Sequence, residues 1–507
     1  MKKLVTFASD IRINALLCCS ATVLLTACGG AMNDTGGGAQ AQTAAYVQSD
    51  VAGSDANSAA TTPNAVDATA AQAAEAAGNG NFELVGYDTH PLAASTADAA
   101  VAPAAQDAST AEAAPANGAP RLLAMVSSVP TTTTTTTEAA AVTNTAQESA
   151  TVQLSTPATT YNYYVSPTGN DSAAGSKAAP FKTLAKAAKM ATKASTTVWV
   201  APGTYAGGIK TTASGAASAR IYWVSTTKWG AKVVPPSSSS NNNAWDNRGN
   251  YVSIIGFDID GSNSGSGTAW THGIYTGGSY GMIANNHIYN VAQKVACTSA
   301  GGSAIGVDSY YHGVLTDVIG NVVNDIGPKG CTYVQGIYFS TSGTIKNNLV
   351  YRVGAVAIHL WHDATNVTIT NNTVTTSNFG MVIGGGDFYY NKTGANNVFV
   401  ANNIVYDNKY GISEQGTTGK NNQYKNNLIY KNPSYNISLR NGLTASGTVS
   451  SDPLFKAYST TAATPDFHLS SSSPAIGRGI ATNAYATDLD GKARSASTGY
   501  DIGAYQH

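Results

Sequence analysis

The stretch of sequence that decides the fold is Asn347-Asn348-Leu349-Val350-Tyr351, because close copies of it recur along the second half of the chain. Each copy opens with Asn-Asn or Gly-Asn and continues into a short strand-like segment. The copies occupy residues 285–289, 320–324, 347–351, 371–374, 402–406 and 426–430. Units this short cannot bury an apolar face alone and must stack on one another. The repeat therefore predicts a solenoid.

The spacing of the copies indicates which solenoid it is. Successive copies lie 35, 27, 24, 31 and 24 residues apart. A 24-residue turn accommodates three short strands, and the longer intervals leave room for loops at fixed corners. Asn tolerates the left-handed backbone of a tight corner, and stacked Asn side chains can hydrogen-bond along the axis. We therefore predict an all-β, right-handed parallel β-helix in which the Asn pairs are structural.

Strand alternation divides the start of each repeat into two faces. The residues predicted to point inward are Ile274, Ile305, Ile337, Ile358, Met381 and Ile412. Their outward neighbours are Tyr275, Gly306, Tyr338, His359, Val382 and Ser413. The outward residues two positions further on are Asp308, Ser340, Trp361, Gly384 and Gln415. Glu414 has two predicted positions: counting from the Asn pairs places it outward with Asp308 and His359, whereas counting from the strand start places it inward.

The composition of the chain changes near residue 159. Residues 28–159 are rich in Ala, Thr and Ser, include a run of Thr at residues 131–137, and show no sustained apolar periodicity. Such a segment cannot bury a core, so we expect a disordered tether. Residues 160–507 are then the β-helix domain. The net charge of −1 argues against nucleic acid, whose binders carry a concentrated basic face, and we expect a monomer.

Residues 1–27 have the features of a signal peptide, with Lys2 and Lys3 before a short apolar stretch. The stretch ends at Leu25-Thr26-Ala27-Cys28, which resembles the bacterial lipobox. The resemblance implies that Cys28 is lipidated and that the protein is anchored to the outer membrane or cell surface.

Two cysteines remain in the predicted domain. Cys297 lies eleven residues after Asn286, and Cys331 lies ten residues after Asn321, so the two occupy equivalent places in successive repeats. Stacked turns would bring them together, and an oxidising compartment favours a disulfide. Free thiols are the alternative.

A short helix is predicted near the start of the domain. Pro180 stands where its missing N–H costs least, and Phe181, Leu184, Ala185 and Ala188 share one face. Stacked strands leave an open apolar end, so we expect this helix to act as a lid.

With these segments in place, the chain from about residue 160 to 507 resembles the pectate-lyase-like family of secreted β-helix proteins. The opening resembles pectate lyase family nine and comprises residues 164–171, 180–184 and 202–205. The close resembles the C-terminal module of surface-anchored β-helix proteins and comprises residues 452–455, 467–469, 473–477 and 501–505. The resemblance implies a scaffold that hosts polysaccharide lyases, glycosidases and epimerases, and therefore a polysaccharide partner. It supplies no catalytic set, because one fold hosts many chemistries.

The outward column suggests the chemistry of a polysaccharide lyase. Cleavage of a uronic-acid polymer by β-elimination needs a base, an acid for the leaving oxygen, and a group that holds the substrate carboxylate. We assign His359 as the base and Tyr338 as the acid, with Asp308 close by. The residues predicted to bind substrate are Trp361, Tyr275, His362, Asp363 and Arg352. Lys346 or calcium is an alternative partner for the carboxylate.

Two other functions fit the same surface. An inverting glycoside hydrolase needs two carboxyl groups roughly 6.5–9.5 Å apart, for which the candidates are Asp308, Asp363, Asp387 and Glu414. A glycan-binding or adhesion protein needs no catalytic group. Calcium is the one cofactor that the sequence suggests, through the alternating oxygen donors of Asp258 and Asp260, although a plain polar turn is the competing interpretation.

Overall fold

The structure is a computed structural model that describes residues 156–237, 241–262, 269–298, 301–497 and 499–507. Residues 1–155 lie outside this range, and with them the predicted signal peptide, Cys28 and almost all of the predicted tether. No helix among the described residues is long and apolar enough to cross a membrane.

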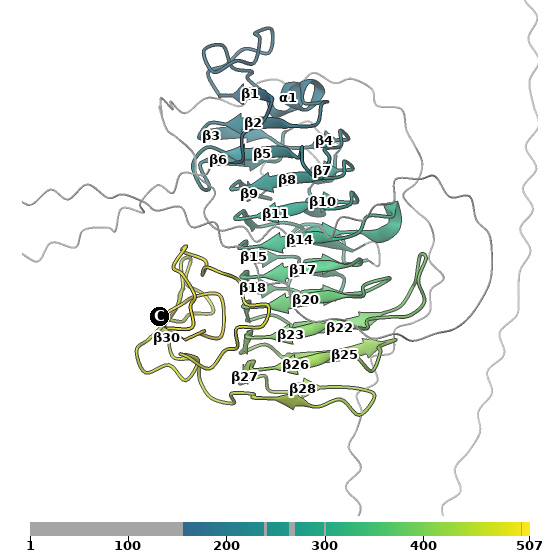
Figure 1. The fold of residues 1–507 in the computed structure, drawn as a ribbon, viewed down its shortest axis with the longest axis vertical. Helices are drawn as coiled ribbons and strands as arrows, with labels where there is room; N and C mark the ends of the chain where they lie inside the picture. The colour runs from purple at the N-terminus through teal and green to yellow at the C-terminus, as the bar shows by residue number, and fades with distance from the viewer. Residues whose placement is uncertain (1–155, 238–240, 263–268, 299–300, 498) are drawn as a thin grey trace, which may run out of the picture. The chain divides into compact units, whose positions relative to one another are not determined.

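The described chain winds through three long parallel sheets, and each full turn adds one strand to each sheet (Figure 1). Sheet 1 contains, in order, β1 (Tyr161–Val165), β2 (Thr196–Val200), β5 (Ile221–Ser225), β8 (Val252–Ile255), β11 (Met282–Ala284), β14 (Thr316–Ile319), β17 (Gly343–Lys346), β20 (Val367–Thr370), β23 (Phe399–Ala401), β26 (Gln423–Lys425) and β29 (Ala445–Ser446). The predicted right-handed parallel β-helix is confirmed.

The other two sheets run beside it. Sheet 2 contains β4 (Ile209–Thr211), β7 (Asn243–Asn247), β10 (His272–Thr276), β13 (Gly302–Val307), β16 (Val334–Phe339), β19 (Val356–Leu360), β22 (Phe379–Gly385), β25 (Tyr410–Gly416) and β28 (Tyr435–Ser438). Sheet 3 contains β3 (Gly203–Ala206), β6 (Ala231–Val234), β9 (Asp258–Asp260), β12 (His287–Tyr289), β15 (Val322–Ile326), β18 (Leu349–Val353), β21 (Thr373–Thr375), β24 (Ile404–Tyr406) and β27 (Leu428–Tyr430).

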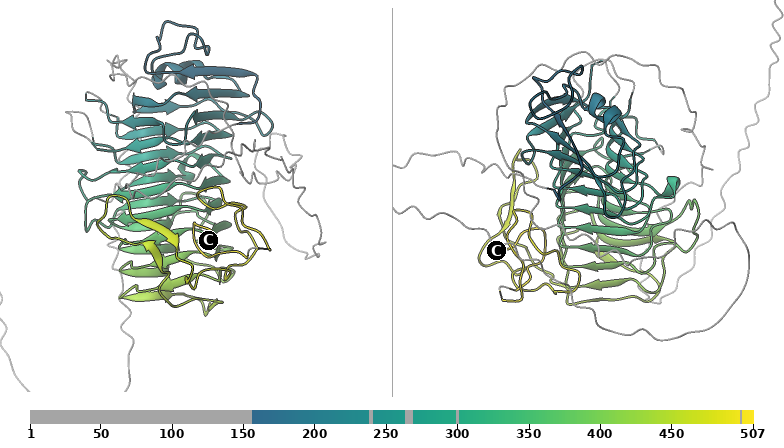
Figure 2. Two further views of the ribbon diagram at one scale, coloured as in Figure 1. Left: turned by 90° about the vertical axis from the view of Figure 1, so that its left-hand side faces the viewer. Right: turned by 45° about the horizontal axis from the view of Figure 1, so that its top comes forward.

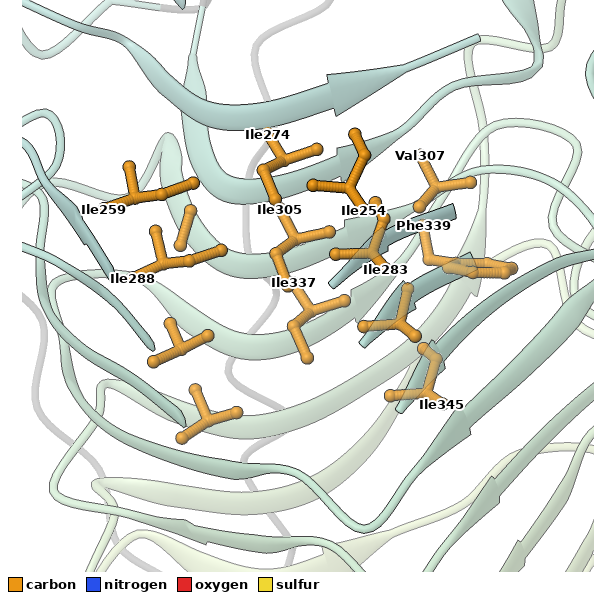
Figure 3. Packing of buried hydrophobic residues seen from close by; sticks show 14 of the residues in the cluster. Ile254, Ile259, Ile274, Ile283, Ile288, Ile305, Val307, Ile337, Phe339 and Ile345 are labelled. Carbon is orange, nitrogen blue, oxygen red and sulfur yellow. The ribbon is translucent and has the colours of Figure 1, made fainter. Parts of the chain in front are cut away.

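The core fills the space between the sheets with columns of stacked aliphatic side chains (Figure 3). In sheet 2 one such column follows the strand register from Ile274 to Ile412, and every member is fully buried. Its members are Ile274, Ile305, Ile337, Ile358, Met381 and Ile412. The inward set predicted from strand alternation is therefore confirmed.

The Asn pairs have the structural role that we predicted. The first residue of a pair takes the left-handed conformation, as at Asn347 with φ 59°. The second residue is fully buried and forms a ladder: the backbone N and Nδ2 of Asn321 both donate to Oδ1 of Asn348, at 2.9 and 3.0 Å. Asn348 donates in the same way to Asn372, at 2.9 Å in both bonds. Each side chain thus fastens one corner to the next.

Replacing a ladder residue should destabilise the fold strongly. Asn348→Ala removes an acceptor from two buried donors of Asn321, and we expect a loss of about 2 to 4 kcal/mol in the free energy of unfolding. Denaturant unfolding of the domain measures this loss. Asn421→Ala is the matched control, because Asn421 is exposed and should change stability by less than about 0.5 kcal/mol. Equal stability of the two variants would contradict a structural ladder.

The N-terminal helix covers the first turn, but its boundaries differ from our prediction. Helix α1 spans Leu184–Met190 and is capped by Thr183, whose Oγ1 accepts from the backbone N of Lys186 at 3.0 Å. Pro180 therefore precedes the helix and does not occupy its first turn. The helix buries Leu184 and Ala187 against the core. The predicted buried face was therefore wrong at Ala185, which is exposed, because the prediction started the helix too early.

The C-terminal module packs on the outer face of sheet 3 (Figure 2). It contains the antiparallel pair β30 (Phe455–Ala457) and β31 (Asp466–Leu469). Phe467 packs with Tyr351 of β18, and Leu469 belongs to a cluster with Ile404 of β24. This module covers much of one outer face, and sheet 2 has no comparable cover among the described residues.

The predicted disulfide is confirmed. Cys297 and Cys331 are bonded, with 5.5 Å between their Cα atoms. The two cysteines lie in the loops that lead into β13 and β16, so the bond links two neighbouring turns at the entry to sheet 2. Closing a loop of this length contributes about 3 to 4 kcal/mol by the chain-entropy argument.

Candidate functional site

The outer face of sheet 2 holds most of the residues predicted to act on substrate. Tyr338 of β16 and His359 of β19 are register partners, and their ring centroids lie 5.2 Å apart in an edge-to-face arrangement. Trp361 follows β19, 5.5 Å from the ring of His359. Tyr275 of β10 and Asp308 at the end of β13 lie further along the same face. We call these five residues the site strip.

His359 is held neutral by its surroundings. Burial lowers the pKa of its imidazole from 6.5 to about 3, and the charge of the nearby His362 acts in the same direction. Nδ1 of His359 is buried and has no hydrogen-bond partner within the described part of the chain. At neutral pH the side chain is therefore an unprotonated imidazole with free acceptor capacity.

Tyr338 is held in the protonated form. Burial raises the pKa of its hydroxyl well above the usual range, and the nearby Tyr389, Asp308 and Asp387 raise it further. The strip therefore places a neutral imidazole beside a phenol that keeps its proton. One is a proton acceptor and the other a proton donor at the same pH.

Asp308 is fixed by three hydrogen bonds. Its Oδ1 accepts from the backbone N of Tyr310 at 3.0 Å and from Oγ of Ser340 at 3.2 Å. Its other oxygen accepts from the hydroxyl of Tyr275. Asp308 caps the short 3-10 helix Ser309–Tyr311, so the carboxylate also sets the path of the loop after β13.

His362 and Asp363 sit at the corner after β19 and organise a second loop. Oδ1 of Asp363 accepts from the backbone N of Asn391 at 3.1 Å, and its Oδ2 accepts from Oγ of Ser309 at 3.1 Å. Nδ1 of His362 lies 2.7 Å from the carbonyl oxygen of Asp387. Asp363 is buried by these contacts, so it holds the loop that follows β22 in place.

Four exposed tyrosines on these two loops were missed by the sequence reasoning. They are Tyr310, Tyr311, Tyr389 and Tyr390, and their exposed fractions run from 37% to 53%. The loops touch: the hydroxyl of Tyr390 donates to the carbonyl oxygen of Tyr310 at 2.6 Å, and the rings of Tyr310 and Tyr389 lie 5.3 Å apart. The available signal was a Tyr-Tyr pair in each of the two longest repeat intervals.

Arg248 was also missed. Its guanidinium lies over the ring of Tyr275 at 4.7 Å and over the ring of Tyr311 at 3.8 Å. Nε of Arg248 lies 2.6 Å from Oδ1 of Asp246. Arg248 directly follows β7, the strand of sheet 2 that pairs with β10, which carries Tyr275.

Arg352, predicted to bind substrate on the strip, lies elsewhere. It belongs to β18 of sheet 3, where Nε and Nη2 each donate to a carboxylate oxygen of Asp325 at 2.7 Å. Nη1 donates to the carbonyl oxygen of Ala462 in the C-terminal module at 2.9 Å. Arg352 lies there because the chain enters sheet 3 directly after each Asn pair, and Arg352 follows the pair Asn347-Asn348. Lys346, the alternative, is largely buried in β17 of sheet 1.

Glu414 lies inside the β-helix. It pairs in register with Ile383 and is 3% exposed. Its Oε1 accepts from the hydroxyl of Tyr424 at 2.8 Å, and its Oε2 accepts from the backbone N of Arg440 at 2.7 Å. Counting from the strand start was therefore correct. Counting from the Asn pairs was wrong, because loops of different length lie between that strand and the next pair.

The acidic pair proposed for calcium lies on sheet 3. Asp258 lies 2.9 Å from Nδ1 of His287, and Asp260 forms an ion pair with Lys232 at 2.9 Å. No group of three or more His, Cys, Asp or Glu side chains suited to a metal occurs among the described residues. A calcium site at Asp258 and Asp260 stays a prediction.

A family model described as "Protein of unknown function (DUF1565)" matches residues 167–212, from the corner after β1 to just past β4. No curated protein matches the chain.

Several solved structures are similar to this chain. Pectate lyase Pel9A is 19% identical with a TM-score of 0.38, and the match covers 69% of this chain and 97% of that one. The GH136 lacto-N-biosidase from Eubacterium ramulus is 12% identical with a TM-score of 0.38, and the match covers 54% of this chain and 56% of that one. An alginate lyase from Paenibacillus sp. str. FPU-7 is 16% identical with a TM-score of 0.34, over 53% of this chain and 92% of that one.

The three stacked parallel sheets give this chain the fold of a right-handed parallel β-helix.

Proposed function

We propose that the protein is a carbohydrate-active enzyme that cleaves an extracellular acidic polysaccharide by β-elimination at the site strip. The observation that carries the proposal is the pair of His359 and Tyr338. A neutral imidazole lies beside a protonated phenol, with 5.2 Å between the two ring centroids. β-Elimination needs one group that accepts a proton and another that donates one, both within reach of the same sugar linkage.

Each group of the pair has a role that its environment favours. The imidazole of His359 takes the proton alpha to the uronate carboxylate, and the electron pair forms the new double bond as the glycosidic oxygen leaves. Tyr338 donates its proton to that oxygen. A pKa of about 3 makes the free imidazole a weak base, but a bound carboxylate beside it stabilises the imidazolium and raises its pKa. The substrate therefore strengthens the base that acts on it.

The rings of the strip suit a sugar polymer. Sugar rings present C–H faces that pack on aromatic side chains. Trp361 and Tyr275 are half-buried on the outer face of sheet 2, and the tyrosines of the two loops stand beside them. The strip follows the long axis of the β-helix, so a chain lying along it meets one turn after another.

Removing either member of the pair should abolish cleavage and retain binding. We expect His359→Ala and Tyr338→Phe each to lower kcat by about 100-fold or more, since an acid or base contributes roughly that factor. The measurement is the ultraviolet absorbance of the unsaturated uronate end formed from polygalacturonate or alginate. Tyr430→Phe, an exposed tyrosine of β27 on sheet 3, is the matched control and should keep full activity. Full activity of both strip variants would place the catalytic centre elsewhere.

Hydrolysis is the second candidate function. Asp308 belongs to the site strip, and Oδ2 of Asp387 accepts from Nε1 of Trp361 in the strip at 3.1 Å, so each of the two loops brings a carboxylate to it. Asp363, another of the predicted carboxyl candidates, is engaged by backbone amides and Ser309. New reducing ends without the unsaturated product, lost in Asp387→Asn, would favour hydrolysis. Binding without any cleavage would favour an adhesion role.

The pH dependence tests the proposed state of the base. Neutral imidazole is the form present above its pKa, and burial lowers that pKa from 6.5 to about 3 in the free protein. We therefore expect kcat/KM to stay constant down to about pH 5, because this parameter reports the free enzyme. Tyr338 should add no alkaline limb below about pH 9, since its pKa is raised. A fall in kcat/KM centred near 6.5 would contradict a buried neutral His359.

We also propose that Cys28 carries a lipid that anchors the protein to the outer membrane or cell surface, on the lipobox at residues 25–28. Cys28→Ser should abolish incorporation of labelled palmitate and release the protein into the soluble fraction. Cys19→Ser, within the predicted signal peptide, is the control and should leave both unchanged. Labelling of the Cys28→Ser variant would refute the anchor.

A further inference from the structure

The guanidinium of Arg248 is enclosed in an unusual way. The ring of Tyr275 lies 4.7 Å and the ring of Tyr311 3.8 Å from its central carbon. Such stacking is a cation–π arrangement and keeps the plane of the guanidinium fixed. Asp246 lies 2.6 Å from Nε, so this carboxylate occupies one edge of the group.

One donor group of Arg248 lacks a partner. Nη1 is buried and makes no hydrogen bond with any residue that the structure describes. Buried guanidinium nitrogens are normally hydrogen-bonded, and leaving one unsatisfied is unfavourable. Arg352 provides the contrast within the same chain, because Nε, Nη1 and Nη2 of that side chain all have acceptors. Arg248 is therefore a charged donor that the protein itself leaves incomplete.

The surroundings indicate which ligand would complete it. A carboxylate matches the planar fork of a guanidinium, with two parallel N–H···O bonds. The Tyr311 ring is 45% exposed and lies over the guanidinium, and the Arg248 side chain itself is 21% exposed, so a ligand from solvent reaches the side chain beside that ring. A sugar that carries a carboxylate presents both matching surfaces. The nearby carboxylates of Asp246 and Asp308 would repel the carboxylate of such a sugar, and the positive charge of Arg248 offsets that repulsion.

The position along the strip decides which sugar of a polymer is bound. From β10, which carries Tyr275, to β19, which carries His359, the sheet adds three strands. At about 4.8 Å a strand this amounts to roughly 14 Å. A single sugar ring is shorter than that span, so Arg248 and His359 must engage different sugars of one chain.

We propose that Arg248 is a specificity-determining residue that binds the carboxylate of a uronate at a subsite remote from His359, in a clamp completed by Tyr275 and Tyr311. The proposal rests on the proposed function, since it assigns an acidic polymer to the site strip. It predicts that the protein prefers chains long enough to reach both residues.

Binding to matched charged and uncharged polymers tests the clamp. The full chain carries His359→Ala so that no polymer is cut, and Arg248→Gln, Arg248→Lys or Arg352→Gln is added to that background. The probes are polygalacturonate and polymannuronate, each compared with its methyl ester. We expect Arg248→Gln to raise the Kd for the acidic polymers by about tenfold or more and to leave the Kd for the esters unchanged. The Kd of Arg248→Lys for the acidic polymers should lie between these values, because lysine keeps the positive charge and lacks the two parallel donors of a guanidinium.

Arg352→Gln is the matched control, because it removes a guanidinium on sheet 3 and should leave every Kd unchanged. Thermal unfolding of each variant shows whether the fold is retained. Equal losses for charged and esterified polymers, no loss in Arg248→Gln, or no binding of any acidic polymer would each overturn the clamp. If the selective loss is found while the chain with His359 intact forms no unsaturated ends, the clamp stands and the lyase proposal fails.

Discussion

The register between successive turns is the constraint on which the rest of the molecule depends. A parallel β-helix has no single sheet that fixes all its strands, so each turn must be located on the one before it. The buried Asn ladder does this at one corner, where both nitrogen donors of Asn321 reach Asn348 and those of Asn348 reach Asn372. Because side chains alternate between faces, a slip of one residue would move every outward group into the core. Fixed corners therefore also fix the surface.

The site strip is a consequence of that register. Tyr338 and His359 do not belong to one sequence motif, yet strand pairing places them side by side. The loops at one end of the sheet 2 strands add what the strands cannot. Asp308 and Asp363 each fasten a loop by accepting backbone N–H groups, and exposed tyrosines then stand beside the strip. The carboxylates of these two residues hold the loops in position. The protonation states of His359 and Tyr338 follow mainly from burial.

Burial shifts the pKa values of the two proposed proton-transfer groups in opposite directions, as the proposed β-elimination requires. An imidazole removed from water loses its charged form, and a phenol removed from water keeps its neutral form, so one environment lowers the pKa of His359 and raises that of Tyr338. No ion pair is needed for this effect. The C-terminal module packs on sheet 3 and engages Arg352 there, and the proposed site lies on a different sheet, sheet 2.

The sequence by itself determined the repeat, the inward column from Ile274 to Ile412, the Asn corners and the Cys297–Cys331 pair. Each of these features follows from the sequence repeat, because the position of a residue in the repeat determines its place in the turn. Tertiary structure alone decided that Glu414 is buried, that Arg352 faces the C-terminal module, and that Arg248 lies between two tyrosine rings. The positions of Glu414 and Arg248 depend on the length and path of inserted loops, which interrupt the period, and the contact of Arg352 depends on where the C-terminal module packs. The sequence therefore specifies the stack, and the loops, through contacts between distant turns, decide which side chains meet on its surface.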